Sequence, residues 1–161
     1  MRYNTIKLND IANGEGINLS IWVQGCPHHC DGCFNQETWN FSDGEEFTPA
    51  TLLYILDNIN NNDVDRNLSI LGGEPLCEQN IHTVLAICEY VKQRFPNKKI
   101  YLWTGYILED FNKDQKEILE WIDYLIDGPF EKDKKDLTLK MRGSSNQRVF
   151  EVINNQIDQI L

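Results

Sequence analysis

Three of the five cysteines lie together in one short segment. Cys26, Cys30 and Cys33 fall within eight residues, in the order Cys-Pro-His-His-Cys-Asp-Gly-Cys. An odd number of cysteines with this crowding is unlike the framework of a secreted disulfide protein. In a reducing cytosol, three thiols on one loop are more typical of a metal or an iron–sulfur cluster. If they hold three irons of a cubic cluster, the fourth iron lacks a protein ligand and can bind a substrate or cofactor directly.

Structural zinc is the alternative chemistry for this loop. A closed zinc site needs four ligands, and His28, His29 or Cys77 would complete the set. Nucleobase deaminases also use three cysteines on zinc, but the H-x-E motif they require is absent. We expect Cys88 to be an inert core thiol and Cys77 a spare, partly buried one.

The segment Gly72-Gly73-Glu74-Pro75 is the second pattern that could do chemistry. Glycines allow the backbone to approach a ligand closely, and a carboxylate can accept hydrogen bonds from an ammonium group. The alternative is a plain strand-to-helix turn, with Pro75 at the first helical position and an acid favoured by the helix dipole.

Short apolar runs predict the elements that must carry these motifs. Strand formers cover residues 19–23, 68–71, 100–103 and 124–126, and helical periodicity covers 48–59, 81–95 and a stretch near 118–121. Strands that alternate with helices pair in parallel through right-handed crossovers. The carboxyl ends of the strands then share one face, where α/β proteins bind ligands, and both motifs fall at such ends.

Length and charge narrow the class of protein. We expect the 161 residues to form one domain, 1–161, since the chain has no repeat and no linker. A net charge of −10 opposes binding to nucleic acid or to anionic membranes. With no long apolar run and a polar start, the sequence predicts a cytoplasmic protein.

The cysteine spacing followed by Gly-Gly-Glu-Pro resembles the radical S-adenosylmethionine (SAM) superfamily. The resemblance implies that Cys26, Cys30 and Cys33 hold a [4Fe–4S] cluster whose open iron is chelated by SAM. It also implies that the segment Gly72 to Glu74 contacts the amino group of SAM. The cofactor then performs the hard chemical step while the protein positions it.

Further segments resemble the anaerobic ribonucleotide reductase activating family. They run from about Ile11 to Arg148 and comprise Asn13-Gly14-Glu15-Gly16, Gln24-Gly25-Cys26, Cys33-Phe34-Asn35, Thr38-Trp39 and Arg142-Gly143-Ser144-Ser145-Asn146-Gln147-Arg148. The resemblance implies reductive cleavage of SAM and transfer of the radical to a glycine of the large reductase subunit. It also implies a low-potential electron donor such as flavodoxin, and leaves open whether the activase is a homodimer.

Site residues follow from the same resemblance. SAM contacts are expected from the cysteine loop and from the strand ends, namely Gly32, Phe34, Gly72, Gly73, Glu74, Thr104 and Asp127. For Asp127 a simple turn role is an equal alternative. Many superfamily members place an aromatic residue where this chain has Gly32, so Phe34 is the expected substitute. Recognition of a carboxylate or of a partner's backbone is expected from Arg142, Ser144, Asn146, Gln147 and Arg148, with a solvated loop as the alternative.

These observations together predict one α/β domain, an incomplete parallel (βα) barrel of about five or six strands that is open laterally. An open side would admit a glycine carried by another protein. Two other functions stay open: a compact radical SAM enzyme acting on a small molecule, similar to the 7-carboxy-7-deazaguanine synthases, and a zinc-stabilised interaction module without catalysis.

Overall fold

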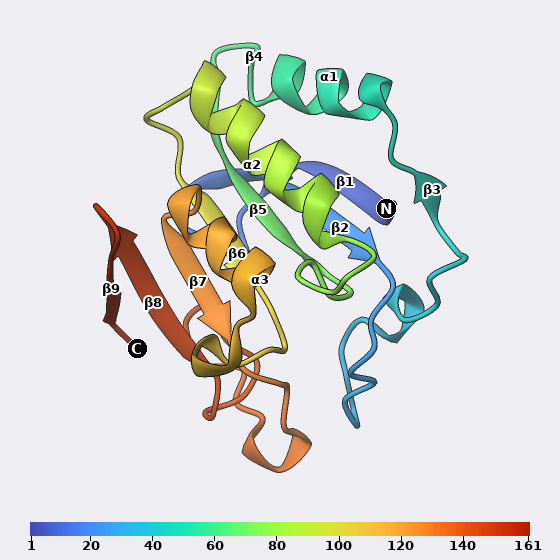
Figure 1. Cartoon of the computed structure of the whole chain (residues 1–161), viewed down its shortest axis with the longest axis vertical. Coiled ribbons are helices and arrows are strands. Elements are labelled where there is room, and N and C mark those ends of the chain that lie inside the picture. The colour runs from blue at the N-terminus through green and yellow to red at the C-terminus, as the bar shows by residue number, and fades with distance from the viewer.

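A computed structural model describes all residues, 1–161, as a mixed sheet with helices on one face (Figure 1). The strand order is β3-β1-β2-β5-β6-β7-β8-β9, and the short β4 pairs with β5. The strands are β1 (Arg2–Asp10), β2 (Ile17–Gln24), β3 (Glu45–Glu46), β4 (Asn60–Asn61), β5 (Val64–Gly72), β6 (Ile100–Trp103), β7 (Tyr124–Asp127), β8 (Arg148–Ile153) and β9 (Gln156–Gln159). The α-helices are α1 (Pro49–Asn58), α2 (Ile81–Arg94) and α3 (Lys113–Glu117), and the 3-10 turns are η1 (Gln36–Thr38), η2 (Leu108–Asp110), η3 (Ile118–Glu120) and η4 (Lys132–Lys134).

The centre of the sheet is parallel, as the alternation of strands and helices predicts. Strands β2, β5, β6 and β7 pair in parallel, and their apolar residues align across the sheet in the register Ile21↔Ile70↔Leu102↔Leu125. All four carboxyl ends therefore lie at one edge of the sheet. The cysteine loop follows β2 at this edge, and the Gly-Gly-Glu-Pro turn follows β5.

The flanks of the sheet correct the prediction of a wholly parallel fold. Strands β1 and β3 on one side, and β8 and β9 on the other, pair antiparallel, and the sheet does not close. An incomplete barrel is thus not confirmed. For the pairs β1–β2 and β8–β9 the physical reason is connection length, since neighbouring antiparallel strands need only short links; β7 and β8 are joined instead by the long loop 128–147. Asn154 and Asn155 join β8 to β9 with φ of 50° and 63°, the positive values that a two-residue hairpin turn requires.

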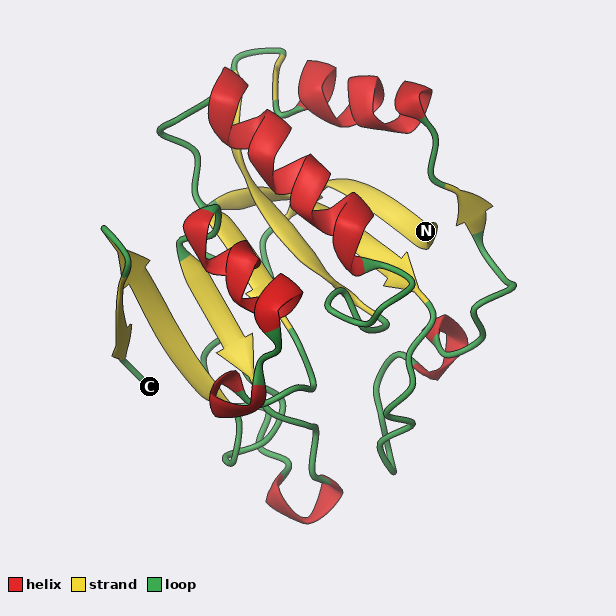
Figure 2. Cartoon of the chain, in the orientation of Figure 1, coloured by secondary structure: helices red, strands yellow, loops and turns green.

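The three helices cover the same face of the sheet, with α2 and α3 crossing in front of the strands in Figure 2. Thr48 caps α1 through Thr51, and Pro49 occupies the first turn, as the sequence predicts. The inward face of α2 is formed by Ile81, Val84, Ile87, Cys88 and Val91. They join residues of all the parallel strands in one core of 22 buried apolar side chains. None of the helices has the length and apolarity that a membrane span requires.

The opposite face of the sheet carries aromatic and small polar side chains. Tyr101 on β6 stacks on Tyr124 of β7, with ring centroids 4.7 Å apart. The segment that links β1 to β2 lies over this face, because the Ser69 hydroxyl donates to the Asn13 carbonyl at 2.6 Å. Gly14 approaches Tyr101 so closely that a Cβ there would lie 2.9 Å from the ring. A loop, rather than a helix, therefore covers this face and borders the cavity described next.

Candidate functional site

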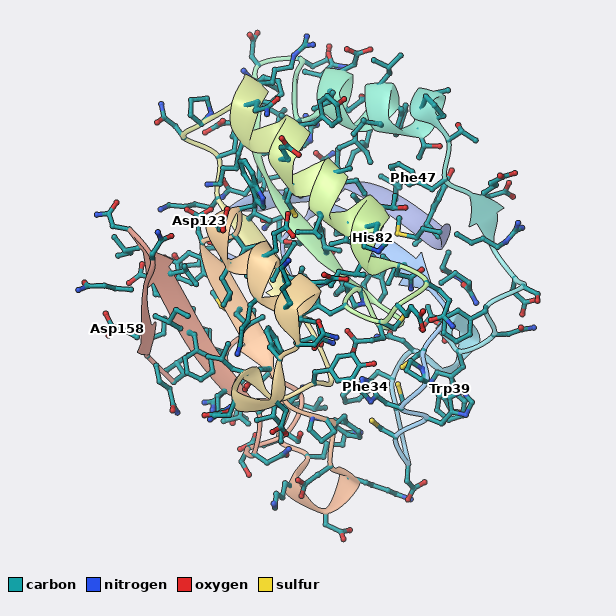
Figure 3. The ribbon with its side chains drawn as sticks, viewed as in Figure 1. Phe34, Trp39, Phe47, His82, Asp123 and Asp158 are labelled. Atoms are coloured by element: carbon teal, nitrogen blue, oxygen red, sulfur yellow. The ribbon has the colours of Figure 1, made fainter.

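A cavity of about 390 Å³ opens at the carboxyl edge of the parallel strands. Its wall combines the cysteine loop, the ends of β5 and β6, and the loop after β7. Of the residues predicted from the sequence, it contains Cys26, Cys30, Cys33, Phe34, Gly72, Gly73, Glu74, Thr104, Arg142 and Gln147. In Figure 3, Phe34 and Trp39 lie close to yellow sulfur atoms at the lower right. The two sequence motifs thus meet at one cavity.

The cysteine loop is closed at its base by main-chain hydrogen bonds. The amides of Gly25 and Cys26 donate to the carbonyls of Thr38 and Trp39, at 2.7 Å and 3.1 Å. Gly25 has a φ of 95°, and a Cβ at this position would overlap the ring of Phe41, so glycine is required. The base therefore fixes where the loop begins and ends while its middle projects from the sheet.

All three loop thiols are free, and their residues border the cavity. Cys26 is buried, whereas Cys30 and Cys33 are partly exposed. The Asn35 amide donates to the Cys33 sulfur at 3.3 Å. No three His, Cys, Asp or Glu side chains converge as a ready set of metal ligands. The loop would therefore have to adjust its side chains to hold a cluster, and three soft sulfur donors on one accessible loop suit iron–sulfur ligation.

Burial favours the protonated form of two of these thiols. Desolvation raises the pKa of Cys26 to about 11, with the Glu74 carboxylate adding a smaller increase. Burial also raises the pKa of Cys30, and the neighbouring Cys33 adds to it. Since metals bind thiolates, loading the site must release protons.

Glu74 is the most enclosed polar side chain of the cavity wall, with no exposed surface. Its Oε1 accepts from the Leu76 amide at 2.9 Å and from the Thr104 hydroxyl at 2.7 Å. Its Oε2 accepts from the Gly105 amide and from His28 Nε2, each at 2.7 Å. Sequence reasoning considered His28 only as a zinc ligand, whereas the structure places it on Glu74.

The two glycines before Glu74 allow the chain itself to pack closely. Gly72 has a φ of 105°, and a Cβ on it would lie 2.9 Å from the main chain of Trp22. A Cβ on Gly73 would lie 2.5 Å from the Gly25 carbonyl oxygen. These glycines are therefore needed to seat the turn against the base of the cysteine loop, whatever ligand the cavity holds.

Gly32 and Asp127 do not border the cavity. Gly32 faces the side chain of Lys132. Asp127 is fully buried and accepts from the Arg148 guanidinium and from the Leu108 amide. Arg148 also forms two hydrogen bonds with Glu109, at 2.8 Å and 2.7 Å. This pairing raises the pKa of Arg148 and lowers that of Glu109 to about 2.

The segment from Arg142 to Arg148 is held by hydrogen bonds within itself and to the end of β7 and the loop that follows it. Gln147 Oε1 accepts from the amides of Gly143 and Ser144, and Asn146 donates to the Pro129 carbonyl at 2.7 Å. Ser144 is buried, and neither it, Asn146 nor Arg148 borders the cavity. Arg142 does border the cavity, and its buried Nε has no hydrogen-bond partner.

Two tryptophans of the cavity wall were missed from the sequence. Trp22 and Trp103 line the cavity from β2 and β6, and Trp103 Nε1 donates to the Met141 carbonyl at 2.8 Å. Both follow the alternation of their strands, which is the signal that could have found them.

Of the two cysteines outside the loop, Cys88 is fully buried in the core, as predicted. Cys77 is more deeply buried than predicted, at 2% exposure.

Comparison with known proteins places these features in a family. A family model described as a 4Fe-4S single cluster domain matches residues 12–150. An anaerobic ribonucleoside-triphosphate reductase-activating protein of Escherichia coli K12 is 39% identical over 150 residues, which cover 92% of this chain and 97% of that protein. Proteins of the same name from Haemophilus influenzae and from phage T4 are also 39% identical, covering 91% and 93% of this chain and 96% and 94% of their own lengths. The chain therefore belongs to the family of anaerobic ribonucleoside-triphosphate reductase-activating proteins.

Proposed function

We propose that the protein is a radical SAM activase that generates the glycyl radical on the large subunit of anaerobic ribonucleotide reductase. The observation that carries this proposal is the cavity at which three free thiols meet the Gly-Gly-Glu-Pro turn. The names of its relatives support the reductase as the target, in preference to a small molecule. The match to a 4Fe-4S domain favours a cluster over structural zinc.

The cluster would be held by Cys26, Cys30 and Cys33. Three thiolates leave one of its four irons without a protein ligand, and SAM would bind to that iron. When bound, the reduced cluster would supply one electron that cleaves SAM into methionine and a 5′-deoxyadenosyl radical, which takes a hydrogen atom from the target glycine. That electron would come from a low-potential donor of the flavodoxin type. The protein's part is to hold the thiolates, to orient SAM and to exclude water.

The remaining wall of the cavity suits SAM. Its volume of about 390 Å³ falls within the usual size of small-ligand sites. Trp22, Trp103 and Phe34 offer aromatic surface for the nucleoside. Gly72, Gly73 and Thr104 border the same space and would lie along the methionine part. Gly32 and Asp127, which lie outside the wall, are left out of the proposed SAM site.

The segment 132–142 forms the rim of the cavity, and its side chains support the proposal that the substrate is another protein. The segment 132–142 carries five basic and two acidic residues, although the whole chain has a net charge of −10. Leu137 of this segment is 76% exposed and borders the cavity. Lys135 lies 4.8 Å over the Phe34 ring and has no acidic partner. Since Lys132, Lys134 and Lys140 already pair with Asp31, Glu131 and Glu15, we assign this rim to a segment of the reductase that carries an apolar side chain for Leu137 and a carboxylate for Lys135.

Electron paramagnetic resonance (EPR) on the reductase tests the proposal. The cluster-loaded protein, SAM, a strong reductant and the large reductase subunit are mixed anaerobically, and the glycyl radical signal is recorded. We expect the signal only when all four components are present and when Cys30 is intact. A functional cluster that cleaves SAM without producing a radical on the reductase would contradict the assigned partner.

A further inference from the structure

The carboxylate of Glu74 is saturated by the protein itself. A carboxylate offers about four lone-pair positions, and Glu74 receives four hydrogen bonds of 2.7 Å to 2.9 Å. Its side chain has no exposed surface. A further donor could bind Glu74 only by displacing one that is already there.

His28 differs from the other three donors because it reaches Glu74 from the cysteine loop. Leu76 lies two residues after Glu74, and Thr104 and Gly105 follow the neighbouring strand β6. His28 instead lies 46 residues earlier in the chain, between the first two loop cysteines. The hydrogen bond of its side chain to Glu74 therefore ties the middle of the cysteine loop to the Gly-Gly-Glu-Pro turn.

The His28 ring is confined by packing as well as by its hydrogen bond. It meets Tyr106 edge to face, with centroids 4.6 Å apart and planes at 71°. On another side it lies over Gly105, where a Cβ would come within 2.6 Å of the ring. A glycine at position 105 is therefore needed for the ring to occupy this place.

We propose that His28 is a positioning residue that sets the cysteine loop in register with the Gly-Gly-Glu-Pro turn. Its hydrogen bond to Glu74 holds the segment between Cys26 and Cys30 against the wall before any cofactor binds. The Glu74 carboxylate then accepts the hydrogen bond that holds the loop, and the main chain of Gly72 and Gly73 is left to face the amino group of SAM. Only this last consequence, together with the role of the cluster, rests on the proposed function.

The neighbouring histidine provides a matched control. His29 is exposed, has a φ of 48° and stacks on Trp39 at 4.6 Å with planes 10° apart. It makes no hydrogen bond to Glu74. The variant His29→Asn keeps a residue that tolerates this backbone conformation, so it removes an imidazole from the same loop without touching the proposed tie.

Alkylation of the metal-free protein tests the tie directly. Each variant is treated briefly with iodoacetamide, and modification of Cys26 is followed by mass spectrometry. His28→Phe keeps an aromatic ring against Tyr106 but cannot donate, and we expect Cys26 to react about tenfold faster, the factor that corresponds to about 1.4 kcal/mol. His28→Gln retains an N–H donor of similar reach and should react within about twofold of the wild type.

Three outcomes would overturn the proposal. They are a wild-type rate in His28→Phe, an equal acceleration in His29→Asn, and a failure of His28→Gln to restore protection. Thermal unfolding of each variant shows whether any acceleration comes from global destabilisation, and equal loss of stability in His28→Phe and His28→Gln would also count against a local tie.

The reconstituted protein gives a second, spectroscopic readout. After loading with iron and sulfide and reduction, EPR spectra are recorded with and without SAM. We expect His28→Phe to bind the same amount of iron as the wild type but to lose the SAM-induced change in the spectrum, and His28→Gln to recover it. If the wild type itself shows no SAM-induced change, the proposed function fails, while the alkylation experiment still decides the role of His28.

Discussion

Replacement of Arg148 by alanine should destabilise the protein more than replacement of its exposed partner, Glu109. The guanidinium joins the start of β8 to the end of β7 through Asp127, which has no exposed surface. Arg148 itself is 25% exposed, and its other partner, Glu109, is 62% exposed. Arg148→Ala therefore leaves a buried carboxylate whose remaining donor is the Leu108 amide.

The expected loss in the free energy of unfolding is about 3 kcal/mol. Removing one member of a buried ion pair costs about 3–5 kcal/mol, because the other charge is left uncompensated. Partial exposure of Arg148 places this site at the lower end. A domain of this size has about 5–15 kcal/mol of stability in total, so the change should be large. Asp127→Asn in the Arg148→Ala background removes the uncompensated charge and should recover part of the loss.

Urea unfolding followed by circular dichroism measures these differences. With a slope of about 2 kcal/mol per molar, Arg148→Ala should lower the midpoint by about 1.5 M. Glu109→Ala removes only the exposed partner and should leave the midpoint near that of the wild type. Equal midpoints for Arg148→Ala and Glu109→Ala would refute the reasoning, since burial of Asp127 would then have no energetic consequence.

Three other predictions concern the cysteines, the rim of the cavity and the ion pair of Glu109. Cys30→Ala should abolish both the bound iron and sulfide and the cleavage of SAM, whereas Cys88→Ala, in the core, should retain both; equal loss would contradict the division of the cysteines. Leu137→Ser should weaken association with the large reductase subunit, measured by sedimentation or calorimetry, while Leu53→Ser on α1 should not. The pKa of Glu109, held at about 2 by its arginine partner, lies below its unfolded value, so the small contribution of this exposed pair to stability is present at neutral pH and is lost as the pH falls from about 4.5 towards 2. Acid titration of the Glu109→Gln variant should lack this component, and an unchanged acid profile would contradict it.

The parallel centre of the fold could be predicted because its strands are buried on both faces. Residues 19–23 and 68–71 are short apolar runs, and helices with regular apolar spacing separate them. The flanking strands gave a weaker signal. β1 mixes polar and apolar residues and is mostly half-buried, and β9 is largely exposed, so neither presents a continuous apolar run. Their antiparallel pairing, which includes β8 beside β7 after the long loop 128–147, is revealed only by the structure.

The candidate site was predictable where residue type dictates chemistry and not where packing decides. The three loop cysteines and the Gly-Gly-Glu-Pro turn border one cavity, as their positions at strand ends predict. By contrast, nothing in the sequence indicates that Arg148 is paired with a buried aspartate, or that His28 reaches Glu74 across the site. Such contacts join residues far apart in the chain and depend on side-chain directions that spacing does not encode.

Formation of 5′-deoxyadenosine tests the central claim most directly. The protein is reconstituted anaerobically with iron and sulfide, reduced and given SAM, and the product is quantified by chromatography, with Cys30→Ala as the control. The account predicts 5′-deoxyadenosine and methionine in equal amounts from the wild type and none from the variant. No product from the wild type, together with stoichiometric zinc and no sulfide in the protein as isolated without added metal, would contradict it.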